Sequence, residues 1–113
     1  MTTNLRALAY EIKLWVVNEK GEAVFGDGLA ALLEDIDKTN SMLESAQNLR
    51  MSYRYLLHRI TLAEKRLGKL LVNRSRGGAK GGGFSQVTPF GKELCQRYRK
   101  ARVELGKVLK TLP

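Results

Sequence analysis

The side chains best suited to chemistry in this chain are cations and hydroxyls grouped in its middle. They are Ser52, Arg54, Tyr55, His58, Arg59, Arg74, Arg76 and Lys80. Arginine pairs with a guanine edge through two hydrogen bonds, while lysine, serine and tyrosine suit contacts to phosphate. The pattern therefore favours binding of a polyanion, although a solvated cationic face without a partner would have the same composition.

The same residues give little support for catalysis or for a metal site. The chain has one histidine, His58, and one cysteine, Cys95, which are too few ligands for zinc. Asp35 and Asp37 are explained most simply as the solvent-facing side of a helix. No Ser/His/Asp or Cys/His arrangement has plausible partners, so we predict no enzymatic activity, no metal and no cofactor.

Charge is distributed unevenly along the chain, whose formal net charge is +9. Residues 1–40 carry four Lys/Arg against seven Asp/Glu, whereas residues 41–88 carry nine against two. Residues 89–113 carry seven against two. An acidic front followed by a basic remainder indicates one basic surface that faces a polyanion.

Length and composition are typical of one globular domain, which we expect to span residues 1–113. No apolar run approaches the ~18 residues of a membrane span, and the N-terminus lacks a signal pattern. A single cysteine excludes an internal disulfide and fits a reducing compartment. We therefore expect a cytoplasmic, nucleoid-associated protein with no membrane partner.

The first part of the chain, residues 1–26, is predicted to form a β-hairpin. Residues 8–17 alternate as a strand does, and residues 22–25 form a short returning strand after the turn NEKG. Asp27 is then a candidate N-cap for a helix over 28–38.

Residues 27–68 have the pattern of a helix-turn-helix. A second helix is expected over about 43–49, and Ser52 is expected to cap a third helix that runs to about Leu67, with Gly68 as its left-handed C-cap. The third helix carries Arg54 and Arg59, the first two cations of the group named above, so it is the predicted recognition helix. The inward positions of the last two helices are predicted to be Leu43, Ala46, Leu49, Tyr53, Leu56, Ile60, Ala63 and Leu67.

Residues 69–88 are predicted to be the wing of a winged helix, a mainly α fold with small β. The strands LLVNRS and FSQV flank RGGAKGGG, whose glycines allow close approach to phosphate and the positive φ of a turn. A Walker-type loop is excluded because Lys80 is followed by Gly81 instead of Ser or Thr. A plain linker would not lie between two strands. Double-stranded DNA is the polyanion that this fold binds.

The last segment, residues 89–113, is predicted to be a long dimerisation helix that begins at Thr88-Pro89. Its apolar residues recur at spacings of mostly three and four, closer to a heptad seam than to a globular face. A second copy is the simplest partner for such a seam, so we predict a homodimer. The interface residues are predicted to be Phe90, Leu94, Tyr98, Ala101, Leu105, Val108 and Leu112.

The stretch MSYRYLLHRITLAEKRLGKLLVNRSRGGAKGGGFSQVTPFGKEL resembles the N-terminal winged-helix domain of the molybdate-responsive regulators, the ModE family. The helix opening MSYR, the strand entry LGKLLV, the glycine wing and the turn VTPFG occur in that order. Upstream, KLWVVNEKGEAVFGDGLAALLEDIDKTNS is similar to the family's opening hairpin and first helix. The resemblance covers about residues 8–105. It implies a dimeric DNA-binding domain related to the LysR-type regulators and acting at promoters.

Two departures from that family are visible. Arg50 stands at the tight turn where the family usually has glycine, so this turn differs or Arg50 contacts a phosphate. The family's C-terminal oxyanion-binding region is not found before Pro113, so we expect molybdate binding by this chain to be unlikely.

The predicted function is sequence-specific transcriptional regulation by a homodimer on a palindromic operator. The recognition helix, about 52–67, would enter the major groove, and the wing would follow the phosphate backbone. Two alternatives remain: an interaction module that forms heterodimers with a full-length regulator, and an architectural protein that binds DNA of any sequence.

Overall fold

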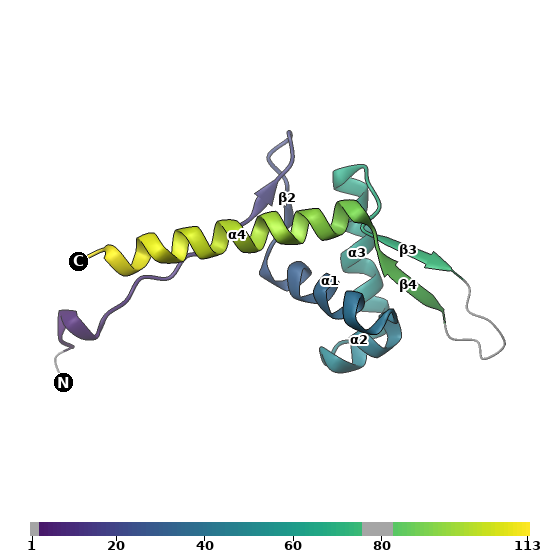
Figure 1. Cartoon of the computed structure of the whole chain (residues 1–113), viewed down its shortest axis with the longest axis horizontal. Helices are drawn as coiled ribbons and strands as arrows, with labels where there is room; N and C mark the ends of the chain where they lie inside the picture. The colour runs from purple at the N-terminus through teal and green to yellow at the C-terminus, as the bar shows by residue number, and fades with distance from the viewer. Residues whose placement is uncertain (1–2, 76–82) are drawn as a thin grey trace.

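The computed structural model describes residues 3–75 and 83–113, and these form a winged helix-turn-helix extended by a long C-terminal helix (Figure 1). In chain order the elements are η1 (Leu5–Ala7), β1 (Val16–Val17), β2 (Ala23–Phe25), α1 (Asp27–Thr39), α2 (Met42–Asn48), α3 (Tyr53–Leu67), β3 (Val72–Ser75), β4 (Phe84–Val87) and α4 (Pro89–Thr111). The expected fold class, mainly α with small β, is confirmed.

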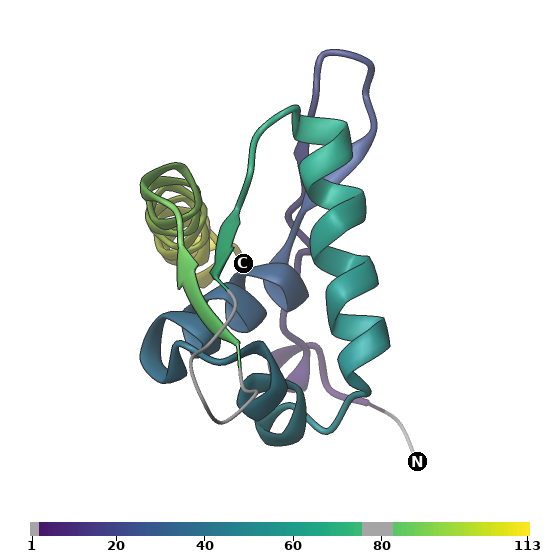
Figure 2. The same cartoon turned by 90° about the vertical axis from the view of Figure 1, so that its right-hand side faces the viewer.

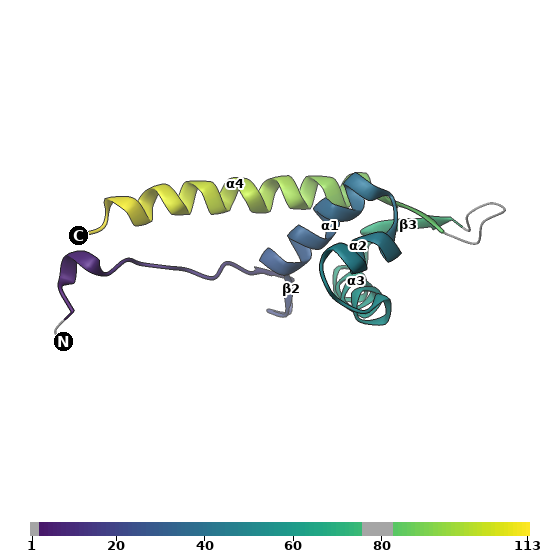
Figure 3. The ribbon, with the colours of Figure 1, turned by 90° about the horizontal axis from the view of Figure 1, so that it is seen from below.

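The N-terminal strand is much shorter than predicted. β1 and β2 pair antiparallel, with Val16 opposite Phe25, but residues 8–15 form no regular element. These residues belong to an N-terminal arm, residues 3–15, that runs extended beside α4 (Figure 3). Ile12 and Leu14 are half-buried while Glu11 and Lys13 are exposed, because the arm turns one side to that helix instead of pairing with a strand.

Two local predictions for α1 and α2 are wrong. Gly26, not Asp27, is the N-cap of α1, and it makes no side-chain cap; the Asp27 carboxylate contacts arginines of α4 instead. A Cβ at position 26 would lie 2.7 Å from the indole of Trp15, so the close approach of Trp15 requires glycine there. In α2 the inward residue of the first turn is Met42, and Leu43 is exposed.

The predicted ends of α3 are confirmed. The Ser52 hydroxyl accepts a hydrogen bond from the Tyr55 amide at 3.0 Å, and Gly68 adopts φ +68° at the C-cap. The buried stripe consists of Leu56, Ile60 and Ala63. Tyr53 was expected to extend that stripe but is 44% exposed, because the stripe begins at Leu56, three residues further along the helix.

The two strands of the wing and the start of α4 follow the sequence closely. β3 and β4 pair antiparallel from Val72–Val87 to Ser75–Phe84. Thr88 caps α4 through its hydroxyl, and Pro89 occupies the first turn, as predicted. The segment RGGAKGGG lies almost wholly within residues 76–82, outside the described residues, so its predicted role at the wing tip stays a prediction.

The hydrophobic core lies between α1, α2, α3, the wing strands and the first half of α4 (Figure 2). Leu33, Ile36, Leu56 and Ile60 are completely buried there. α1 passes between α3 and α4, so these two helices lie on different sides of the core (Figure 3). The C-terminal half of α4 and the arm project beyond the core, which gives the molecule a longest dimension of 61 Å against a shortest of 19 Å.

Candidate nucleic-acid interface

The turn before α3 positions the first residues of that helix. Arg50 has φ +55°, the left-handed conformation that glycine adopts most easily. The turn is held by the amide of Met51, which donates to the Ala46 carbonyl at 3.0 Å. Arg50 therefore adopts the left-handed conformation at the position where the resemblance expects glycine, and its side chain is exposed beside the start of α3. Its predicted contact with a phosphate stays a prediction.

The N-terminal face of α3 presents Ser52, Arg54, Tyr55 and His58 to solvent. No acidic residue lies in the first turn of the helix. The positive end of the helix dipole and Arg54 therefore favour an anion at this end. Tyr53, assigned to the core from the sequence, joins this exposed face.

Arg59 lies on the flank of that face, not at its centre. Its Nη1 donates to the Tyr55 hydroxyl at 3.3 Å, and its guanidinium carbon lies 5.8 Å from the centre of the Tyr55 ring. The side chain is half-buried, and its Nη2 would lie 3.2 Å from a Cβ placed on Gly28 at the start of α1. The pairing stiffens both side chains and restricts Arg59 to the edge of α3 nearest α1.

The wing strands are tied to α3 by a carboxylate that the sequence analysis overlooked. Glu64 accepts hydrogen bonds from the amides of Leu71 and Val72 at 2.8 and 3.2 Å. It also accepts one from Arg74 at 3.3 Å, and its side chain is only 9% exposed. Arg74, a predicted phosphate contact, thus neutralises Glu64. The sequence did contain a sign that Glu64 has a structural role, because it is the only acidic residue among residues 53–67.

The other wing strand is fixed to the turn between α1 and α2. Ser85 donates from its amide to the Asn40 carbonyl at 2.9 Å, and the Asn40 side-chain amide donates to the Ser85 carbonyl at 3.2 Å. Both wing strands are therefore anchored, β3 to α3 and β4 to α1. Figure 1 shows α3 and these strands at the same end of the molecule, opposite to the free end of α4. Arg76 and Lys80, the two remaining candidates, lie outside the described residues.

The predicted dimer residues of α4 do not share one environment. Tyr98 is 2% exposed, packs edge-to-face on Phe25 with ring centres 5.4 Å apart, and donates its hydroxyl to the Leu14 carbonyl at 3.0 Å. It is a core residue of the monomer, so its assignment to a dimer interface is wrong. Phe90, Leu94 and Ala101 are half-buried, and Cys95 on the same helix is buried. Those that remain exposed are Leu105, Val108 and Leu112.

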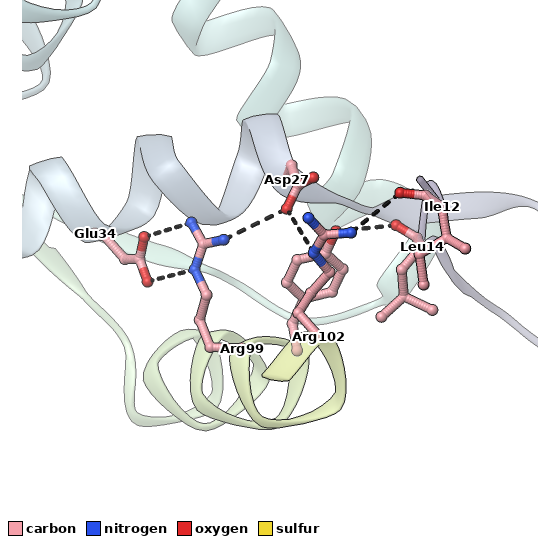
Figure 4. Close-up of polar contacts among 7 residues, drawn as sticks. Ile12, Leu14, Asp27, Glu34, Arg99 and Arg102 are labelled. Carbon is pink, nitrogen blue, oxygen red and sulfur yellow. Dashed lines mark hydrogen bonds and ion pairs between the residues drawn. The ribbon is translucent and has the colours of Figure 1, made fainter. Parts of the chain in front are cut away.

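The first half of α4 is joined to α1 by ion pairs (Figure 4). Arg99 donates to both oxygens of Glu34, at 2.8 and 3.0 Å, and to Asp27 at 3.4 Å. Arg102 lies 3.6 Å from Asp27 and donates to the Ile12 carbonyl at 3.1 Å. The hydrogen bonds from Arg99 lower the pKa of Glu34, while Glu34 raises the pKa of Arg99. None of these four side chains was predicted from the sequence to join α4 to α1.

Within residues 3–75 and 83–113, no group of three His, Cys, Asp or Glu side chains is placed to hold a metal ion. The helices of this part of the chain are also too short or too polar to cross a membrane.

Two solved structures share the fold. ArgP from Mycobacterium tuberculosis aligns with a TM-score of 0.55 and 22% identity over 77% of this chain and 30% of that chain. A BenM DNA-binding domain, solved in a complex with catB site 1 DNA, aligns with a TM-score of 0.51 and 18% identity over 72% of this chain and 83% of that chain. A scan of protein families and a search of curated proteins gave no match.

The fold is therefore a winged helix of the kind seen in ArgP and in the BenM DNA-binding domain. The chain spans about a third of the length of ArgP and most of the BenM domain. At these identities the likeness concerns the fold, so the function has to be argued from the residues described above.

Proposed function

We propose that this chain is a DNA-binding transcriptional regulator that acts in the cytoplasm as a homodimer on a palindromic operator. The observation that carries the proposal is the N-terminal face of α3. It exposes Arg54, Tyr55 and His58 with no acid in the first turn, beside wing strands that are anchored to the same core. Recognition helices present this end to base edges, and wings contact the adjacent backbone.

Two further features support the proposal. The BenM domain of similar fold was solved with DNA, and the net charge of +9 favours a polyanionic partner. The exposed apolar residues at the end of α4 supply a surface on which two copies can associate. The resemblance to the molybdate-responsive regulators stays a prediction, as does the expectation that molybdate does not bind.

The test begins with the DNA fragments that the protein retains from its own genome, because sequencing them defines the operator. Fluorescence anisotropy then compares Arg54→Ala with Arg97→Ala, which removes the same charge from an exposed position on α4. If Arg54 reads a base, Arg54→Ala weakens operator binding by about 1–3 kcal/mol and hardly affects a scrambled duplex. Arg97→Ala should alter neither.

The alternatives give different results in the same experiment. Equal losses on operator and scrambled DNA for every α3 variant would replace the regulator with an architectural protein. No DNA binding, together with capture of a larger regulator through α4, would leave the interaction module.

The Glu64–Arg74 pair adds a quantitative expectation for the wing. A lysine or arginine that neutralises one phosphate contributes about 0.9 to the slope of log affinity against log salt. Since Arg74 already neutralises Glu64, Arg74→Ala should reduce that slope by less than one such unit. A reduction by a full unit would show that Arg74 leaves Glu64 when DNA binds.

A further inference from the structure

We propose that Arg99 and Arg102, with Asp27 and Glu34, set the angle at which α4 leaves the core and thereby the half-site spacing that the dimer accepts. This inference rests on the proposed function. It concerns residues that touch no DNA and act by positioning the two recognition helices.

The location of the four side chains is the first observation. They form an ion cluster between α1 and α4 (Figure 4). Tyr98 is the last buried residue of α4, and the exposed apolar residues that follow begin at Val103. Arg99 and Arg102 therefore make the last side-chain links from α4 to α1 before the helix extends beyond the core.

The second observation is the geometry of these links. Asp27 and Glu34 are seven residues apart on α1, which is about 10.5 Å along a helix. Arg99 pairs with Glu34 and Arg102 with Asp27, so α4 is held to α1 at two separated points, in addition to the packing of Cys95 and Tyr98 on the core. Two separated links resist rotation of one helix axis about the other.

A third element is joined to the same cluster. Arg102 contacts Asp27 and the Ile12 carbonyl, and the neighbouring Tyr98 hydroxyl holds the Leu14 carbonyl. The arm is thus fastened to α4 at the level where the helix leaves α1. The cluster ties α1, α4 and the arm together, and the direction of the free end of α4 depends on all three.

The consequence for DNA follows if the free ends of two α4 helices associate. Each recognition helix then stands at a distance from the symmetry axis that depends on the angle between α4 and its own core. Successive base pairs are about 3.4 Å apart along the helix. A pivot that shifts each core by a few ångströms changes the spacing by about one base pair, so a rigid joint selects one spacing.

The test uses duplexes in which the two operator half-sites are moved apart or together in one-base-pair steps. The unmodified protein is expected to prefer one spacing. In Arg99→Met, which keeps the length of the side chain but not its charge, the affinity ratio between the preferred and neighbouring spacings should fall by about threefold or more. Arg97→Met, two residues earlier on α4 and exposed, is the matched control and should keep the ratio.

A charge exchange separates positioning from a general loss of stability. Glu34→Arg alone and Arg99→Glu alone should both flatten the spacing preference, and the double exchange should restore most of it. Circular dichroism and thermal unfolding establish that each variant is folded. Unchanged spacing preference in folded Arg99→Met would overturn the inference.

A second measurement is independent of DNA. Spin labels at Gln47→Cys on α2 and Val108→Cys on α4, in a Cys95→Ser background and diluted with unlabelled protein, report the angle of α4 as a distance distribution. Arg99→Met should broaden that distribution, and Arg97→Met should not. If the unmodified protein does not bind paired half-sites, the proposed function fails, while the distance distributions still decide whether the cluster fixes α4.

Discussion

The two halves of α4 have similar sequence patterns and different surroundings. The proximal half, residues 89–102, packs against the core through Gly91, Cys95 and Tyr98. The distal half, residues 103–112, continues with apolar residues at similar spacing, but there Val108 is 55% exposed. The two halves meet at the ion cluster of Arg99 and Arg102.

This difference shows that one apolar stripe serves two purposes. In the proximal half the stripe is satisfied within the monomer, where even the Tyr98 hydroxyl has an acceptor. In the distal half one side of the stripe faces the arm and the other side faces solvent. An open groove lies between the arm and α4, and it is lined by Leu5, Leu8, Leu109 and Leu112. The proximal half should therefore determine folding, and the distal half should determine association.

The largest effect is expected from a substitution in the proximal half, and it is a loss of folding stability. Tyr98→Ala removes a buried ring that packs on Phe25 and leaves the Leu14 carbonyl without its donor. Large-to-small substitutions of buried aromatic residues reduce the free energy of unfolding by about 3–5 kcal/mol. Chemical denaturation measures the loss, and Val108→Ala in the distal half should change it by less than about 0.5 kcal/mol. Similar losses for both variants would contradict the division.

The next largest effect is expected from a substitution in the distal half, and it is a loss of dimerisation. Leu105→Lys places a charge in the exposed stripe, so the protein should stay folded and sediment as a monomer where the unmodified protein is a dimer. Loss of the second half-site contact should weaken operator binding by about 100-fold. A monomeric unmodified protein at micromolar concentration would refute the dimer itself.

Much of the fold was predictable because its signals are local. Ser52, Gly68 and Thr88-Pro89 mark helix ends through caps that depend on a few neighbouring residues, and all three are confirmed. The strand predicted over 8–17 was mostly wrong because alternation shows that one side is covered without showing by what. Here α4 covers it, through contacts from Arg102 and Tyr98 that are distant in sequence.

In the candidate site, too, the residues placed by local helix periodicity were predicted, and those placed by contacts distant in sequence were not. Arg54, Tyr55 and His58 face solvent as expected, since they lie opposite a helical stripe that the sequence defines. Glu64 was overlooked, because its partners at Leu71, Val72 and Arg74 come together only when the chain turns back on α3. Tyr98 was misassigned because periodicity identifies the face of a helix but not whether its partner is the same chain or another.

A smaller effect, the difference in cysteine reactivity, also distinguishes the proximal half of α4 from the distal half. Burial raises the pKa of the Cys95 thiol to about 11, so little thiolate is present at pH 8. A cysteine introduced by Val108→Cys, in a Cys95→Ser background, is exposed in the monomer. Alkylation of Cys95 by iodoacetamide should be at least about tenfold slower than that of the introduced thiol. If copies associate through the distal half, protection of the introduced thiol should increase with protein concentration, while that of Cys95 should not.

The smallest expected effect concerns the pH dependence of the joint between the halves. Hydrogen bonds from Arg99 lower the pKa of Glu34, so the folded protein releases this proton more readily than the unfolded chain. A lowered carboxyl pKa stabilises the fold above the unfolded value, near pH 4.5. That stabilisation is lost as the pH falls through the folded value.

Glu34→Gln should therefore destabilise the protein at pH 7 and do so less at pH 3, because protonation of the unmodified carboxyl group weakens the ion pair as the pH falls through its lowered pKa. Because both partners are about 40% exposed, the difference at pH 7 should stay below about 1 kcal/mol. Glu104→Gln is the distal control, since its partner Lys107 belongs to the same helix and the pair lies outside the joint. Urea unfolding of the three proteins at both pH values measures the difference. A loss for Glu34→Gln as large at pH 3 as at pH 7 would show that the amide disturbs packing, and the ion pair would then not be what holds α4 to α1.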